Sequence, residues 1–207
     1  MEAGAEWNDI FRITQAEGLM PLAATAPSVG VVGFTLNGGF GWLSRKFGPA
    51  ADSLLAVEMV TMNGELMRIT RESQADLFWA LAGGGSHFGI VAGIEVKLHP
   101  IDSIYSARFH FPVSRATEVL ATYRKWTLGL PEELTTLFKL ELLPKVPQIP
   151  EELQGKPGLM IQGCFYGDNA QAHEFFVPLR ALGPILTEEK EMPLLTLPPL
   201  VLNHQTR

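Results

Sequence analysis

The sequence predicts an α+β protein built from short helices and antiparallel strands. Three observations lead to this prediction: helical and strand periodicities alternate along the chain, tight-turn signals separate them, and the first half contains a dense run of glycines. Hydrophobic residues make up 46% of the 207 positions, which is ample material for a buried core. Because a second series of elements begins near residue 105, we expect two domains, residues 1–104 and residues 105–207.

The first half begins with an amphipathic helix. Apolar residues from Trp7 to Thr14 fall at helical spacing, and Gly18 follows where such a helix would end. From Pro21 to Gly48 the glycines are too dense for regular structure, so we expect a shaped loop. The elements expected after it are a β-hairpin of Leu54–Thr61 and Leu66–Thr70 around Asn63-Gly64, a short helix from Asp76 to Ala82, and a strand from Ile90 to Leu98.

The second half predicts the element order β-α-β-β-α. The expected elements are a strand from Tyr105 to Phe111, a helix from Ser114 to Leu128, strands at Leu137–Leu143 and Leu159–Tyr166, and a helix from Ala170 to Leu182. The tail from Met192 to Arg207 is apolar but has no periodicity. We therefore expect an irregular tail whose apolar side chains need a covering segment that this sequence does not contain.

Composition excludes several classes of function. Lys and Arg total 16 against 22 for Asp and Glu, and the net charge of -6 argues against nucleic acid as a partner. No apolar run approaches the ~20 residues of a membrane span, and the acidic start of the chain does not resemble a signal peptide. A cytoplasmic location is therefore slightly favoured, but localisation stays open because a fragment would not show an upstream signal.

Cysteine and histidine give no catalytic or metal signal. The one cysteine, Cys164, cannot form an internal disulfide, and we expect it to be a small buried hydrophobe in its strand. No group of Cys and His has metal-ligand spacing, so no metal is expected. None of the histidines has an acid at a spacing that suggests a dyad.

The glycine-rich stretch from Ser28 to Gly48 is the main candidate for a site. Successive glycines let main-chain N–H groups converge on an anionic or planar ligand, which is how a pyrophosphate-bearing cofactor is held. Tight turns around a small core would explain the glycines equally well. Two simple nucleotide motifs can be set aside: Phe88 replaces the third glycine of a dinucleotide fingerprint, and Gly155-Lys156-Pro157 lacks the rest of a P-loop.

Several motifs taken together resemble a known family. They are Ala26-Pro-Ser-Val-Gly-Val-Val-Gly33, Leu36-Asn-Gly-Gly-Phe-Gly-Trp-Leu-Ser-Arg-Lys-Phe-Gly48, Asp52-Ser-Leu-Leu-Ala-Val-Glu58, Asp76-Leu-Phe-Trp-Ala-Leu81 and Gly83-Gly-Gly-Ser-His-Phe-Gly-Ile-Val91. Their order resembles the FAD-binding PCMH-type domain of the vanillyl-alcohol oxidase superfamily, and most closely its berberine bridge enzyme-like branch. The resemblance implies the second FAD-binding subdomain of that fold, followed by part of an antiparallel-sheet substrate domain with helices on one face.

The resemblance also implies which residues hold the cofactor, FAD. The residues expected along its ribityl and pyrophosphate part are Ser28, Val29, Gly30, Gly33, Gly38, Gly39 and Gly41, and those expected near its adenosine end are Val57, Glu58, Gly89 and Val91. Ala26 stands where some members carry a flavin-bonding cysteine, which excludes a cysteinyl link there. Asn37 replaces a usual glycine, and Asn tolerates the left-handed conformation. The family's histidyl-link segment and C-terminal catalytic segment would lie outside Met1–Arg207, so no catalytic residue can be named.

The activity that this resemblance implies is hydride transfer from an alcohol, sugar or amine carbon of a small substrate to the flavin, with reoxidation by oxygen. Two other interpretations remain open at this point. The chain could be a truncated, inactive homologue that keeps the fold without binding flavin, or a general nucleotide-binding module. In a truncated chain, an open sheet edge or the apolar tail would favour self-association.

Overall fold

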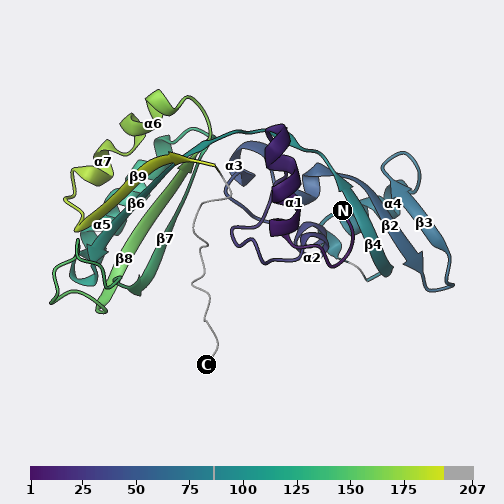
Figure 1. Cartoon of the computed structure of the whole chain (residues 1–207), viewed down its shortest axis with the longest axis horizontal. Coiled ribbons are helices and arrows are strands. Elements are labelled where there is room, and N and C mark those ends of the chain that lie inside the picture. Colours follow the sequence, from purple (N-terminus) through teal and green to yellow (C-terminus); the bar gives the residue numbers. More distant parts are fainter. Residues whose placement is uncertain (86, 194–207) are drawn as a thin grey trace. The chain divides into compact units, whose positions relative to one another are not determined.

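The structure, a computed structural model, describes residues 1–85 and 87–193. Contacts divide these residues into two compact units, Met1–Asp102 and Ser103–Pro193. Each unit contains both helices and antiparallel strands (Figure 1), as expected for the α+β class. Part of the apolar tail predicted from Met192 onward, residues 194–207, lies outside the described residues.

The first unit pairs short helices with two small antiparallel sheets. Its elements in chain order are α1 (Trp7–Thr14), a 3-10 turn (Gln15–Glu17), β1 (Leu19–Met20), α2 (Val31–Leu36), α3 (Ser44–Phe47), a 3-10 turn (Ala50–Ser53), β2 (Leu54–Thr61), β3 (Leu66–Thr70), α4 (Ala75–Gly84), β4 (Gly89–Val96) and β5 (His99–Pro100). The larger sheet has the strand order β3-β2-β4, and β1 pairs with β5. The predicted helix at the start, the hairpin, the short helix and the strand after it are confirmed, whereas the expected shaped loop contains the two short helices α2 and α3.

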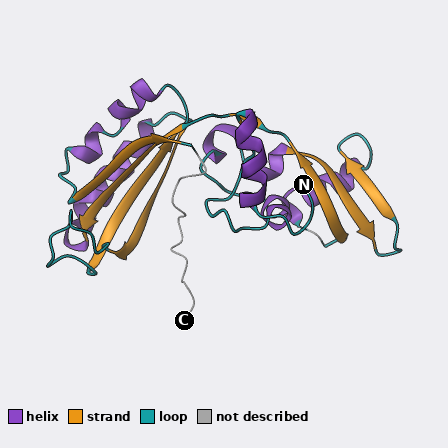
Figure 2. Cartoon of the chain, in the orientation of Figure 1, coloured by secondary structure: helices purple, strands orange, loops and turns teal. Residues whose placement is uncertain are grey.

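The second unit is a four-stranded antiparallel sheet with helices on one face, as Figure 2 shows. Its elements are β6 (Ile104–Pro112), a 3-10 turn (Val113–Arg115), α5 (Ala116–Trp126), a 3-10 turn (Thr127–Gly129), β7 (Leu134–Leu142), β8 (Pro157–Phe165), α6 (Asn169–Phe175), α7 (Val177–Arg180) and β9 (Leu186–Met192). The strand order is β7-β8-β6-β9. Because strand side chains alternate between faces, one set packs under the helices and the other faces away from them.

The helix-covered face holds the core of the second unit. Phe109 and Ile161 of the two central strands are fully buried and belong to one apolar cluster with Phe176, which follows α6. The Phe176 ring packs over Gly163, where a Cβ atom would overlap the ring. The absence of a side chain at Gly163 therefore allows the helical layer to approach the central strand closely.

Two expectations for this unit were wrong. The helix predicted from Ala170 to Leu182 is broken into α6 and α7 at Phe176, because Pro178 suits the first turn of a new helix but not the interior of an old one. The sequence pattern also gave no strand at Leu186–Met192, and this segment forms β9. Its charged residues hide the apolar alternation, and charges of this kind are common on an edge strand.

Adding a side chain at Gly163 should destabilise this packing. Gly163→Ala forces a methyl group into the Phe176 ring, so we expect the free energy of unfolding to fall by about 1–3 kcal/mol. Gly129→Ala is the matched control, because nothing lies within 4 Å of a Cβ at Gly129, and it should change stability by less than about 1 kcal/mol. Urea denaturation measures both values, and equal stability of the two variants would contradict the packing described.

Candidate functional site

The glycine-rich segment is anchored on one side by main-chain bonds to α1 and the residues before it. The N–H group of Trp7 donates to the Val29 carbonyl at 3.1 Å, and that of Val31 donates to the Ala5 carbonyl at 2.9 Å. Gly30 lies between these two bonds as the residue that precedes α2, with extended backbone. Its own N–H group therefore points away from α1.

Gly30 and Gly33 leave a bare main-chain surface on α2. Both are exposed, and a Cβ atom at either position would meet nothing within 4 Å. Among the described residues, no acceptor is found for the N–H groups of Gly30, Val32 and Gly33, as expected for the first turn of a helix. Open space beside unpaired donors is what an anionic or planar ligand such as a pyrophosphate requires, so these residues fit that group.

The glycines after α2 have a different role. Gly38 and Gly39 have positive φ angles of 95° and 72°, and their carbonyls accept from the N–H groups of Ala51 and Ala50 at 2.9 Å and 2.8 Å. A Cβ atom at Gly41 would overlap the Ala23 carbonyl oxygen. These three glycines are therefore required by the backbone path itself, whereas Gly30 and Gly33 are not.

The end of α2 is joined to the end of α4. The Gly85 N–H donates to the Leu36 carbonyl at 2.9 Å, which places the Gly83–Gly85 run beside the glycine-rich segment. Asn37 has a φ angle of -96°, so its tolerance of the left-handed conformation is not used. Its side-chain amide instead donates to the Gly33 carbonyl at 2.7 Å and caps the helix.

The four residues predicted near the adenosine end lie on strands β2 and β4. Val57 and Val91 are buried in the core of the first unit. Gly89 packs closely against Met59 and the Val60 carbonyl of the neighbouring strand. Glu58 is exposed, with its carboxylate 3.7 Å from Arg68. These positions explain the four residues by packing and surface charge, and a cofactor contact at them stays a prediction.

The second unit has a polar face that the sequence reasoning did not identify. On the face of the sheet opposite the helices, Gln162 of β8 is fully buried, and neither its amide nitrogen nor its amide oxygen has a hydrogen-bond partner among the described residues. Arg108 of β6 lies directly across the strand pair from it. A buried amide without partners costs free energy, so Gln162 marks a place where a polar ligand could supply the missing bonds.

Titratable side chains lie on the same face of the sheet as Gln162. Nδ1 of His110 lies 3.4 Å from Oε1 of Glu141, and its Nε2 lies 3.6 Å from Oε2 of Glu188. Neither contact has hydrogen-bond geometry, so each becomes an ion pair only when the imidazole is protonated. Burial alone would raise the pKa of Glu141, but its contacts with His110 and Lys139 outweigh burial and lower that pKa. The two acids come from β7 and β9, far from His110 in the sequence, which is why spacing gave no sign of them.

The cysteine, the metal-ligating residue types and the helices of the described residues do not add to these two candidate regions. Cys164 is buried, as predicted, and burial raises the pKa of its thiol, which makes it unreactive. Within residues 1–85 and 87–193, no three His, Cys, Asp or Glu side chains are grouped so that they could hold a metal ion. In the same part of the chain, none of the helices has both the length and the apolar character needed to cross a membrane.

The glycine-rich segment lies within a part of the chain that matches a known protein family. Residues 1–70 match the family described as FAD binding domain. The FAD-linked oxidoreductase azaL of Aspergillus niger is 32% identical over 161 residues, which are 76% of this chain and 32% of that protein. The FAD-linked oxidoreductase DDB_G0289697 of Dictyostelium discoideum is 26% identical over 98% of this chain and 42% of its own length. The chain thus spans 32% and 42% of the lengths of these two curated relatives.

Solved structures agree with the family match. Xylooligosaccharide oxidase from Myceliophthora thermophila C1, in complex with xylobiose, superposes with a TM-score of 0.75 at 27% identity, over 94% of this chain and 40% of that one. The chain also has the fold of a flavoprotein of the vanillyl-alcohol oxidase type from the same fungus, which superposes with a TM-score of 0.78 at 23% identity. Within that group it resembles the berberine bridge enzyme-like FAD-linked oxidoreductases, whose cofactor is FAD.

Gln162 should reduce stability in the absence of a ligand. Gln162→Met keeps the shape of the side chain and removes two unpaired polar atoms, so we expect the free energy of unfolding to rise by about 1–3 kcal/mol. The matched control is Gln154→Met, because the Gln154 amide donates to the Val146 and Ile149 carbonyls at 3.1 Å and 3.0 Å, and its loss should lower stability. Chemical denaturation measures both changes in the free energy of unfolding, which should have opposite signs. A loss of stability in Gln162→Met would contradict the unpaired state of Gln162.

The lowered pKa of Glu141 should appear in the acid range. A carboxylate whose pKa is lower in the folded than in the unfolded state stabilises the fold above the unfolded value, and this stabilisation is lost as the pH falls through the folded value. We therefore expect Glu141→Gln to flatten the fall in stability between about pH 5 and pH 3. Exposed Glu152 offers the control Glu152→Gln. Identical acid-unfolding profiles for wild type and Glu141→Gln would contradict the contacts of Glu141.

Proposed function

We propose that this chain is the FAD-binding and substrate-facing portion of an FAD-dependent oxidoreductase of the oxidase type. The observation that carries the proposal is the bare main-chain surface at Gly30, Val32 and Gly33, within the residues that match the FAD binding domain family. When bound, the flavin would accept a hydride from an alcohol, sugar or amine carbon and pass the electrons to oxygen.

The residues of the glycine-rich segment have two different roles in the proposed binding of FAD. We assign the main-chain contacts with the pyrophosphate to Gly30 and Gly33, because exposed donors and open space occur together there. Ser28 is also exposed and can contribute, whereas the Val29 N–H already donates to the Ala26 carbonyl at 3.2 Å, so a contact of FAD with Val29 stays a prediction. The role of Gly38, Gly39 and Gly41 is to hold the backbone that presents this surface. Ala26 has no thiol, so the segment holds the cofactor without a covalent bond.

The second unit carries the proposed substrate-binding face. On its helix-free face, the buried amide of Gln162 can donate and accept at once, and the opposite charges of Arg108, Lys139 and Glu141 lie on the same face. Such a mixture suits a small uncharged molecule with several hydroxyl groups better than an ion. The solved complex of the related oxidase with xylobiose supports a hydroxyl-rich substrate.

Thermal unfolding with added FAD tests the proposal. A ligand that binds only the folded state stabilises it by about 2.7 kcal/mol when its concentration is a hundred times its Kd, so the Tm of the wild type should rise with FAD concentration. Gly33→Leu fills the open space beside α2 and should abolish this rise without lowering the Tm of the free chain. Gly129→Leu, at another open glycine, should respond to FAD as the wild type does.

Two outcomes would contradict the proposal. If FAD leaves the Tm of the wild type unchanged, the chain does not bind flavin, and it is then an inactive homologue of the family. If ADP protects as well as FAD at equal concentration, the segment recognises nucleotides in general. Retention of the full FAD effect in Gly33→Leu would show that the cofactor is held elsewhere.

A further inference from the structure

Strand β7 forms an open edge of the sheet in the second unit. Among the described strands, β7 pairs only with β8, and the opposite edge is formed by β9. The two edges differ in chemistry, because β9 carries the charged sequence Glu188-Glu189-Lys190-Glu191. On β7 the side chains of Phe138, Leu140 and Leu142 are 50%, 64% and 65% exposed. An edge of this kind is a template for pairing with another strand.

The main chain of β7 has the donors and acceptors that such pairing needs. Leu143 exchanges hydrogen bonds with the segment that leads into β8, donating to the Lys156 carbonyl and accepting from the Gly155 N–H, both at 2.9 Å. The Glu133 carbonyl accepts from Tyr166 on the same side. Because these directions alternate along a strand, the N–H and C=O groups of Phe138, Leu140 and Leu142 point to the open edge.

The sequence of this edge is complementary to itself. If two copies of β7 run antiparallel with Leu140 opposite Leu140, then Phe138 faces Leu142 and all three apolar side chains meet on one face. On the other face, Lys139 of each copy lies opposite Glu141 of the other. We propose that this chain forms a two-fold dimer through β7, with about six new main-chain hydrogen bonds joining two sheets into one.

Other registers lack this match. Centring the pair on Phe138 places Lys139 against Leu137 and Glu141 against Thr135, so no opposite charges meet. Centring it on Leu142 places Lys139 against Lys145 and brings in Pro144, which has no N–H group to donate. The Leu140 register is thus the one in which charge, apolar contact and hydrogen bonding agree.

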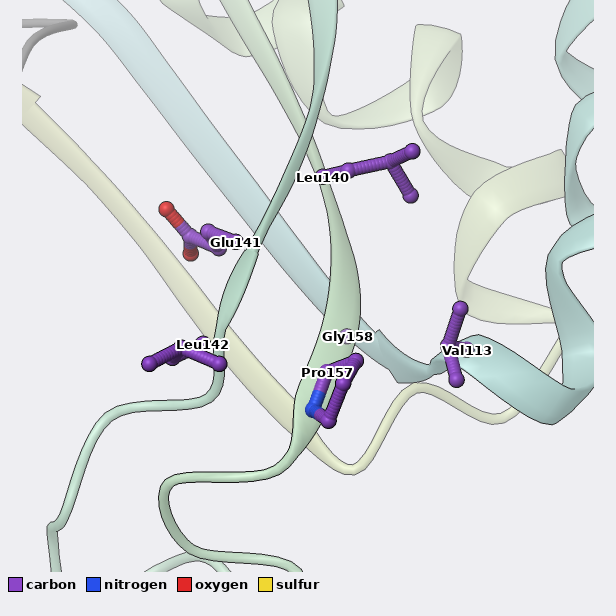
Figure 3. A pocket seen from close by; sticks show the side chains of 6 residues that line it. All are labelled: Val113, Leu140, Glu141, Leu142, Pro157 and Gly158. Atoms are coloured by element: carbon purple, nitrogen blue, oxygen red, sulfur yellow. The ribbon is translucent and has the colours of Figure 1, made fainter.

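A hollow beside β7 gives the second copy a place to pack. It is a cavity of about 350 Å³ lined by Val113, Leu140, Glu141, Leu142, Pro157 and Gly158 (Figure 3). Its lining is almost entirely apolar, with Leu142 at one end and Val113 at the other. In the Leu140 register, Phe138 of the second copy lies opposite Leu142 and so next to this hollow, where its ring can be buried.

Sedimentation velocity of the full chain over a range of concentrations tests the proposal, with circular dichroism as the check on folding. We expect a monomer–dimer equilibrium in the wild type. Lys139→Glu and Glu141→Lys each place like charges at two symmetric contacts and should weaken dimerisation by about tenfold at low salt. The double variant K139E/E141K restores opposite charges between the copies and should recover the dimer. Because the swap also restores the ion pair of Lys139 and Glu141 within one chain, the free energy of unfolding of each variant is measured at a concentration where it is monomeric, and dimerisation should follow the charges rather than that stability.

A proline substitution on β7 and a control substitution on β9 complete the experiment. Leu140→Pro removes an N–H group that β8 does not use, so it should leave the fold intact and abolish the dimer. Lys190→Glu makes the same charge change on exposed β9 and should have no effect. The proposal is overturned if the wild type stays monomeric at all concentrations or forms only larger aggregates. It is also overturned if Leu140→Pro still dimerises, or if K139E/E141K dimerises no more strongly than the single variants.

Discussion

The first unit depends on main-chain hydrogen bonds that fix the glycine-rich segment from outside. The N–H groups of Trp7, Val31 and Gly85 donate these bonds at the two ends of α2, and the N–H groups of Ala50 and Ala51 donate to the turn that follows. Since no side chain of the segment takes part in these bonds, its own surface is left free. The backbone is thereby held in one path while the glycine positions remain bare on the open side of α2.

Glycine occurs in the glycine-rich segment for two different physical reasons. At Gly41 a side chain would overlap a neighbouring carbonyl, so glycine is required for folding. At Gly33 a side chain would fit without strain, and folding alone does not explain the glycine. Tight turns and a cofactor cradle therefore do not exclude each other. The turns of Gly38–Gly41 hold the backbone next to Gly30 and Gly33, and all of these glycines lie within residues 1–70, which match the FAD binding domain family.

Much of the fold could be predicted from the sequence, because its signals are local. The hairpin around Asn63-Gly64 and the helix that begins at Trp7 follow from turn chemistry and periodicity within a few residues. Strand β9 could not be predicted in this way, since its charged residues are held by pairing with β6 rather than by a pattern of their own. The polar face of the second unit also depends on contacts between residues that are far apart in the sequence. His110 meets Glu141 and Glu188 only because three strands align in register.

The central claim is that the exposed main chain of the glycine-rich segment binds FAD, and amide hydrogen exchange of the full chain tests it most directly. Unpaired N–H groups exchange rapidly with solvent unless a ligand accepts their hydrogen bonds. We expect FAD to slow the exchange of the Gly30, Val32 and Gly33 amides, while the amide of Gly64 in the distant hairpin turn stays unchanged. Unaltered exchange at these three amides with saturating FAD, or protection confined to other residues, would contradict the account.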